Sequence, residues 1–259
     1  MEKKHSPRNM ARSRWAPRGV AVGVAFAGVV TLIMVMAPFA GASGPRSWAP
    51  PYKGFTSTTS NSLYSSGCTA TAHEPVAPAW SASTGTFSMA GKVSAGRCAS
   101  GYSYASISGD SSIASPTLAR THSGYSYFYL TWNLAVIAKA ALFASPATGN
   151  YSYSGASISG TASAYLVDVT NGSYSYVSTA GATLFGASFT SNGKYMLSTA
   201  GTTSYMYLWG DLVKGDHYQI LIYVDVSVSV YMYNVSGSAS ASVDLAGTHG
   251  LTITGISQY

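Results

Sequence analysis

The chain has 259 residues, of which 47% are hydrophobic, 13% aromatic and only 8% charged. Soluble globular domains average about 25% charged residues, so this composition excludes the charged surface of an ordinary cytosolic enzyme. The aromatic content excludes a disordered polar chain. Most of the net charge of +6 lies in residues 1–42, where six Lys/Arg and one Glu give +5; in residues 43–259, eight Lys/Arg and seven Asp/Glu give +1. This near-neutral remainder argues against nucleic acid as a partner.

The N-terminal segment has the organisation of an export signal. Basic residues precede a stretch, residues 19–37, that carries no charge. Ala40 and Ala42 supply the small side chains that a signal peptidase accepts. We predict a signal peptide over residues 1–42 and an extracellular or cell-surface location. The alternative is an uncleaved signal-anchor helix, since residues 19–37 nearly span a hydrocarbon core of about 30 Å.

Export permits two modifications of the mature chain. Cys68 and Cys98 enclose about 30 residues, and a disulfide closing such a loop contributes roughly 3–4 kcal/mol. We predict this bond, with two buried free thiols as the alternative. Asn150, Asn171 and Asn234 begin N-glycosylation sequons, although a chain this rich in serine contains some sequons by chance.

The next two elements in chain order are a tether and a strand. Residues 43–67 are rich in Pro, Ser and Thr and predict an extended tether, followed by a β domain over residues 68–259. Residues 86–93 predict the first strand of that domain.

A clear period of two appears over residues 125–136. The apolar set from Phe128 to Val136 alternates with Tyr125, Tyr127 and Tyr129, which predicts a strand with one buried face. The stretch 138–143 is the one that tolerates a short helical turn.

Later segments repeat the strand pattern. The strongest runs from Ile220 to Met232, where seven apolar residues alternate strictly with mostly polar ones. At ~3.3 Å per residue this run exceeds an average strand, so we expect it to bend at a bulge or to pass between sheets. The other expected strands are residues 164–169, 174–178, 182–189, 195–198, 204–209, 238–245 and 251–256.

About ten short strands with turn signals between them indicate an all-β fold. We expect an antiparallel β-sandwich of the jelly-roll type after the N-terminal signal or anchor helix. Tyr-Ser-Tyr and Ala-Ser-Ile-Ser-Gly both recur along the chain, which indicates tandem units over residues 102–150 and 151–199. The alternative is convergent low complexity in outward-facing strands.

A catalytic set is missing from the sequence. Glu74 is the one glutamate after residue 42, so the pair of carboxylates that glycosidases use has no clear candidate. Gly109-Asp110-Ser111 resembles the nucleophile block of the Gly-Asp-Ser esterases, but Asp244 and His249 have the wrong spacing for their Asp-x-x-His block. A local turn is the simpler interpretation, and we expect no enzyme activity.

No metal or cofactor is expected either. The histidines are scattered, and neither cysteine has a partner at ligand spacing. The loop holding Asp211 and Asp216 could offer oxygen atoms to calcium, but a polar hairpin turn is the simpler interpretation.

Tyrosine is the distinctive residue of the polar faces. Its flat ring and hydroxyl can stack on sugars, pack against identical subunits, or be covered by a second layer. The candidate contact residues are Tyr125, Tyr127, Tyr129, Tyr151, Tyr153, Tyr174 and Tyr176.

These features together predict a secreted or cell-surface structural or adhesive protein without catalytic activity, which self-assembles through Tyr/Ser-rich sheet faces. Low charge favours such association because it weakens electrostatic repulsion. The expected partners are itself or other cell-surface components. A glycan-binding module that uses exposed tyrosines is the alternative, and a membrane is a partner only through residues 19–37 if these are not cleaved.

Overall fold

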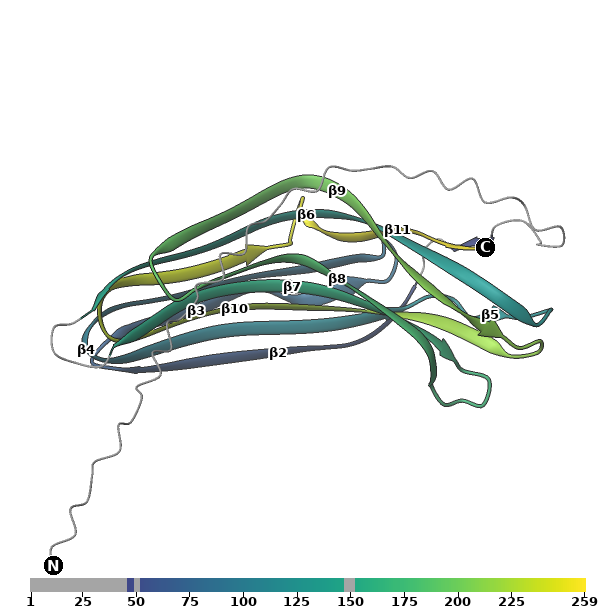
Figure 1. Cartoon of the computed structure of the whole chain (residues 1–259), viewed down its shortest axis with the longest axis horizontal. Helices are drawn as coiled ribbons and strands as arrows, with labels where there is room; N and C mark the ends of the chain where they lie inside the picture. The colour runs from purple at the N-terminus through teal and green to yellow at the C-terminus, as the bar shows by residue number, and fades with distance from the viewer. Residues whose placement is uncertain (1–45, 49–51, 147–151) are drawn as a thin grey trace, which may run out of the picture. The chain divides into compact units, whose positions relative to one another are not determined.

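Alternating apolar and polar residues build this protein from long β-strands (Figure 1). The computed structural model describes residues 46–48, 52–146 and 152–259. The expected signal segment, residues 1–42, lies outside them. Within the described ranges no helix is long and apolar enough to cross a membrane. The strands found there are β1 (Arg46–Trp48), β2 (Lys53–Ser66), β3 (Thr69–Ser81), β4 (Thr86–Ala114), β5 (Leu118–Ala119), β6 (Gly124–Pro146), β7 (Tyr153–Asp168), β8 (Ser175–Phe189), β9 (Gly193–Leu212), β10 (His217–Asp244) and β11 (Gly250–Gln258).

All these strands belong to one antiparallel hydrogen-bonded sheet. Its centre is a closed ring in which β4 pairs with β11, β11 with β6, β6 with β10, and β10 with β4. The remaining long strands extend the sheet outside the ring. β2 and β3 pair with β4, β9 pairs with β6, and β7 pairs with β10 and carries β8 on its far side.

The all-β antiparallel prediction is confirmed, but the two separate sheets of a jelly-roll sandwich are not what the described strands form. The physical reason is strand length: β4 and β10 have 29 and 28 residues, so each takes part in pairings that a sandwich would divide between two sheets. The run from Ile220 to Met232 is expected to bend at a bulge or to pass between sheets, but it pairs with β4 and β7 without a register shift, and the irregular part of β10 follows it. The register of β10 shifts between Tyr233 and Ser238, where Asn234 has a φ of 48° and Gly237 a φ of 128°.

Two local expectations were wrong. Residues 53–66, part of the expected tether, form β2 and pair with β4, for example Ser60 with Ser108. Serine and threonine suit an exposed edge strand as well as a linker, and composition does not separate the two. Residues 138–143, which tolerated a helical turn, lie within β6 because they pair with both β9 and β10.

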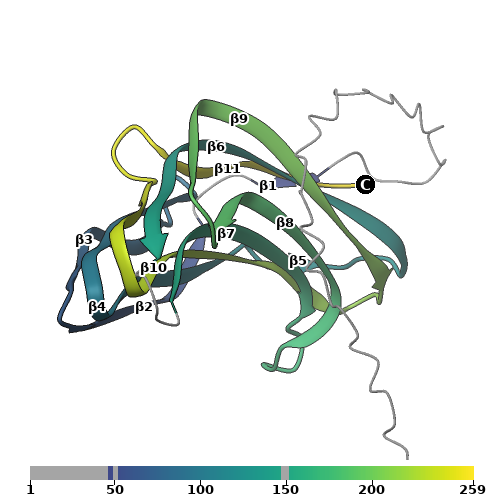
Figure 2. The ribbon, with the colours of Figure 1, turned by 60° about the vertical axis from the view of Figure 1, so that its left-hand side comes forward.

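The core lies between the inward faces of these strands. The predicted alternation holds in both test segments: Ile220 to Met232 and Phe128 to Val136 bury every second residue in one continuous hydrophobic cluster. β8 and β9 contact each other along their edges, as Figure 2 shows for the curved strands. The backbone N–H of Trp209 donates to Ser178 Oγ at 3.2 Å across this contact.

Candidate contact surfaces

A group of aromatic rings covers the outer side of β6 and β9, and we call it the tyrosine face. The strand register places Tyr129 opposite Tyr207 and Tyr127 opposite Trp209. The C-terminal Tyr259 joins them because its backbone N–H donates to the Tyr127 carbonyl at 2.8 Å. The buried residues between these rings, such as Leu208, point to the core. The tyrosine face consists of Tyr125, Tyr127, Tyr129, Tyr205, Tyr207, Trp209 and Tyr259.

The rings of the tyrosine face contact one another and remain open to solvent. Tyr129 stacks on Tyr205 with centroids 5.0 Å apart, and Tyr129 meets Tyr207 edge-on at 5.3 Å. Tyr125 and Tyr127 form a further edge contact at 5.1 Å. All members except Tyr129 are between 47% and 65% exposed. The contacts therefore hold the rings in place without covering them.

Three phenol groups of this face have a raised pKa, which favours their neutral form. Partial burial, followed by the neighbouring Tyr205, raises the pKa of Tyr129. The pKa of Tyr207 is raised first by its hydrogen bond with Tyr205 and then by burial. Burial, the adjacent Tyr127 and then Asp211 raise the pKa of Tyr125. The face therefore carries little charge at neutral pH.

Two further tyrosine clusters lie on the outer side of β2, β4, β10, β7 and β8. At one end of these strands Tyr165 meets Tyr176 and Tyr223 at 5.4 Å each. At the other end Tyr153 stacks on Tyr233 with centroids 4.9 Å apart and also contacts Tyr231.

Hydroxyl groups fill the space between these two clusters, and we call this area the hydroxyl field. Three rows cross the strands, each row made of residues directly opposite one another. The hydroxyls of Ser157 and Ser229 lie 2.7 Å apart, and those of Ser159 and Ser227 lie 2.9 Å apart. In strand order the rows are Ser62, Ser106, Ser229, Ser157 and Ser188; Ser60, Ser108, Ser227 and Ser159; and Thr58, Asp110, Asp225, Thr161 and Thr183.

The third row places two carboxylates side by side. Asp110 and Asp225 are direct partners on β4 and β10, and Asp110 accepts a hydrogen bond from the Thr58 hydroxyl. Partial burial, and then the charge of Asp110, raises the pKa of Asp225. Like charges directly opposite one another destabilise a sheet, so this pair has a cost that local hydrogen bonds partly offset.

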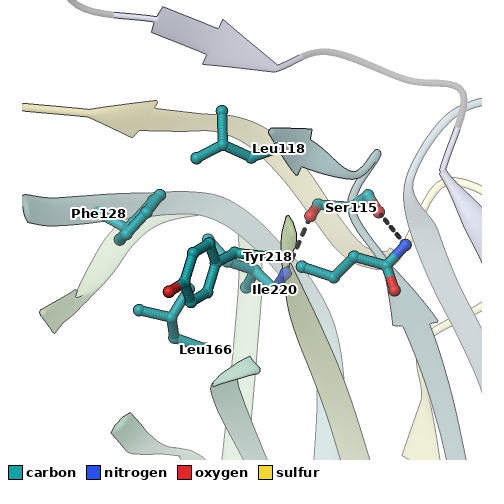
Figure 3. Close-up of a pocket in the computed structure, with 7 residues that line it drawn as sticks. Ser115, Leu118, Phe128, Leu166, Tyr218 and Ile220 are labelled. Carbon is teal, nitrogen blue, oxygen red and sulfur yellow. Dashed lines mark hydrogen bonds between the residues drawn. The ribbon is translucent and has the colours of Figure 1, made fainter. Parts of the chain in front are cut away.

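A small pocket lies between the start of β10 and the loop that joins β4 to β5 (Figure 3). Ser115 Oγ accepts a hydrogen bond from the Ile220 backbone N–H at 2.9 Å, and Gln219 Nε2 donates to the Ser115 carbonyl at 3.3 Å. Leu118, Phe128 and other apolar side chains line the rest. The cavity volume of about 10 Å³ has room for at most about one water molecule, which is too little for a small-molecule ligand.

The strand register brings the backbone positions of the two cysteines close together. Thr69, which follows Cys68, pairs with Gly96 on β4. Cys98 lies two residues further along β4, opposite Val235. Its side chain is outside the described part of the structure, so the Cys68–Cys98 disulfide stays a prediction, which this register favours.

The three sequons occupy different environments. Asn150 is outside the described residues. Asn171 lies in the exposed turn between β7 and β8, where Gly172 has a φ of 74°. Asn234 lies in the bulge of β10, and its Oδ1 accepts a hydrogen bond from the Gly101 backbone N–H at 3.0 Å.

The residues weighed for catalysis and metal binding are engaged in structural contacts. Glu74 accepts a hydrogen bond from Asn61 at 2.9 Å, and the buried Ser111 hydroxyl lies 2.7 Å from that of Ser57. Asp244 and His249 form an ion pair at 3.5 Å. Among the described residues, no three His, Cys, Asp or Glu side chains gather into a metal site.

The structure distributes the predicted contact tyrosines over three places. Tyr125, Tyr127 and Tyr129 belong to the tyrosine face, and Tyr153 and Tyr176 lie in the two clusters beside the hydroxyl field. Tyr174 precedes β8 and is one of the groups that raise the pKa of Tyr223, and Tyr151 is outside the described residues. The candidate set omitted Tyr205, Tyr207 and Trp209. Their alternation with buried Met206 and Leu208 was a usable signal, but their pairing with β6 joins residues far apart in the sequence.

Comparisons with known proteins give a distant structural likeness and no family. No protein-family model matches the chain, and no curated protein matches it. Among solved structures, the chain is similar to the enzymatically active domain of tailspike protein 4 of bacteriophage CBA120, at 15% identity and a TM-score of 0.17. The alignment covers 70% of this chain and 19% of that chain. A likeness this low carries no argument about function.

Proposed function

We propose that this protein is an exported, non-catalytic structural protein of the cell surface, and that it associates with its own copies through the tyrosine face. The observation that carries this proposal is the size of that exposed aromatic surface. Aromatic side chains bury about 150–250 Å² each, so the six rings of the face that are about half exposed present roughly 600 Å².

This area is large for a surface that stays in water. The largest apolar patch on a typical monomer is about 300–600 Å², and a stable protein interface buries about 800 Å² per partner. The tyrosine face therefore lies at the top of the first range and supplies most of the area that each partner buries in such an interface. Its residue types match as well, because tyrosine and tryptophan are enriched where interfaces have most of their binding energy.

Charge supports pairing between identical faces. A face that meets its own copy brings each charge close to an identical charge, which is unfavourable for a charged surface. The tyrosine face consists of neutral rings at pH 7, and Asp211 is the acidic residue paired beside it, opposite Tyr125. Self-association therefore carries little electrostatic cost.

Export is supported by the sequence of the N-terminal segment. Its basic residues, the uncharged stretch 19–37 and the small residues Ala40 and Ala42 together favour cleavage. Mass spectrometry of the exported protein is expected to find Ser43 as the first residue. An N-terminus that still includes residues 19–37 supports the signal-anchor alternative and contradicts cleavage.

Sedimentation velocity of the full chain over a range of concentrations tests the self-association. We expect a concentration-dependent dimer or larger species in the unmodified protein. The double variant Tyr205→Ser and Tyr207→Ser should sediment as a monomer, because it removes two central rings of the face.

The matched control is Tyr174→Ser with Tyr176→Ser, which removes two tyrosines that are equally exposed but lie elsewhere. It should associate like the unmodified chain. A monomer at all concentrations, or equal loss of association in both double variants, would sink the proposal.

A further inference from the structure

The hydroxyl field is built from the recurring segment Ala-Ser-Ile-Ser-Gly. Residues 105–109 on β4 and residues 156–160 on β7 lie on opposite sides of residues 226–230 of β10, in the same register. Both strands run antiparallel to β10, so the two segments point in the same direction. They are related by a shift of two strand spacings, about 9–10 Å. The outer surface thus repeats the same side-chain pattern two strands away, with the rotation that the twist of the sheet adds.

The serine hydroxyls of this surface keep unused hydrogen-bonding capacity. Each serine offers one donor and two acceptor lone pairs. The contact between Ser157 and Ser229 uses one donor and one acceptor, as does that between Ser159 and Ser227. These side chains are half-buried and not covered. A ligand with its own regularly spaced hydroxyls can therefore bind several of them at once.

Aromatic rings border the field at its end next to the first serine row. Tyr64, Tyr104 and Tyr231 form the next row along β2, β4 and β10. Tyr231 leans over Gly155 of β7: a Cβ on that glycine would lie 2.4 Å from the ring. Glycine at position 155 is what admits the ring to this place, and the field is thereby flanked by a flat aromatic surface.

The charge of the field selects against anionic ligands. None of the residues in its three rows is basic, and Asp110 with Asp225 adds negative charge in its third row. Carboxylates accept hydrogen bonds from hydroxyl groups and repel carboxylates, sulfates and phosphates.

From these features we infer that the hydroxyl field binds an extended, uncharged polysaccharide. Sugar hydroxyls hydrogen-bond to the serine rows and to the two aspartates, while a sugar ring packs on the tyrosine border. The field lies on a different set of strands from the tyrosine face, and the inference does not rest on the proposed self-association.

Binding of the full chain to a defined set of polysaccharides tests this inference. The neutral probes are insoluble cellulose, insoluble chitin and soluble xylan, and the anionic probe is polygalacturonate. We expect binding to at least one neutral probe and none to the anionic one. The double variant Ser227→Ala and Ser229→Ala should bind about thirtyfold more weakly, as expected for the loss of two hydrogen bonds of typical net strength.

The matched control is Ser240→Ala with Ser242→Ala on the same strand. These serines are also half-buried but lie outside the field, and their loss should leave binding unchanged. Tyr231→Leu provides a second variant, which keeps apolar bulk over Gly155 but lacks a flat ring. It too should weaken binding.

Several outcomes overturn the inference. These are no binding to any neutral probe, stronger binding to polygalacturonate, or equal binding by the field variants and the control. Inhibition of ice growth by the field without polysaccharide binding would mean that the hydroxyls bind ordered water instead. A changed sedimentation coefficient of the Ser227/Ser229 variant, with polysaccharide binding intact, would identify the field as a contact between copies.

Discussion

At the scale of the residue, two side chains on the same strand, β10, meet very different surroundings. Val226 is fully buried in the core, whereas Ser242 is half-buried and lies between Lys92 and Lys139 on the neighbouring strands. The same substitution at these two positions therefore tests the assignment of faces directly.

Val226→Asp should unfold the domain, because an unpaired charge in the core costs more than about 4 kcal/mol. Ser242→Asp should leave the melting temperature unchanged or slightly higher, since the new carboxylate lies between two lysines. Circular dichroism during heating measures both. Similar losses in the two variants would contradict the assignment of faces.

The local structure also predicts different glycosylation of the two described sequons. Asn171 is exposed in a turn, while the carboxamide of Asn234 is already bonded to the Gly101 backbone within a paired strand. In a host that performs N-glycosylation, we expect a glycan on Asn171 and none on Asn234. Peptide mass spectrometry reads the occupancy of each, and a glycan on Asn234 would show that β10 is modified before it pairs.

At the scale of the element, the long strands depend on a few glycines where they bend. Gly237 has a φ of 128°, and a Cβ there would lie 2.0 Å from the Phe143 carbonyl oxygen. Gly54 on β2 has no atom within 4 Å of such a Cβ.

Gly237→Ala should therefore destabilise the protein by at least about 1–3 kcal/mol, the range for a strained backbone conformation. Gly54→Ala should be neutral. Denaturant unfolding of both variants compares them. Equal stability would mean that the bulge of β10 tolerates a side chain and does not set the register.

The predicted disulfide would connect the start of β3 to β4, just beyond the part of β4 with which β3 pairs. Cys68 precedes β3 and Cys98 lies in the middle of β4. We expect no free thiol in the denatured, non-reduced protein. Cys98→Ser should lower the stability by roughly 3–4 kcal/mol according to the chain-entropy model. Two thiols on titration would refute the bond.

At the scale of the whole molecule, pH should affect stability mainly on the alkaline side. Residues 43–259 hold seven Asp and Glu, so few carboxylates titrate between pH 7 and pH 3. The folded pKa of Asp225 is raised by burial and by Asp110. The stabilisation of the folded state by protonated Asp225 is therefore fully present below the unfolded pKa, and it is lost as the pH rises through the folded pKa. Acid thus favours folding at this site.

At high pH, the ionisation of tyrosines dominates the dependence of stability on pH. Burial is the first cause that raises the pKa of Tyr52, Tyr195, Tyr218 and Tyr223. Their stabilisation is present below the unfolded value of about 10 and is lost as the pH rises through the folded values. The melting temperature should change little from pH 7 to pH 3 and should fall above about pH 10. Calorimetry across this range checks both arms, and a fall of more than about 15 °C in acid would contradict the first.

The sequence by itself determined the strand class, the buried faces and the location of the basic charge. Strict alternation from Ile220 to Met232 and from Phe128 to Val136 has one physical solution, a strand with one face in the core. The same alternation placed both tyrosine and serine on the outward faces of these strands, opposite the core. Each of these features depends on neighbours along the chain, and such neighbours can be read from the sequence.

Only the tertiary structure decided how the strands are joined and which polar residues meet. Ser/Thr-rich residues 53–66 form a strand because β4 offers them an edge, and no local pattern carries that information. The closed ring of β4, β11, β6 and β10, the tyrosine face and the hydroxyl field all depend on pairings between distant segments, such as Tyr129 with Tyr207. Many segments of this chain have a similar strand propensity, so each strand could pair with several others. The choice among these partners depends on the packing of the whole core.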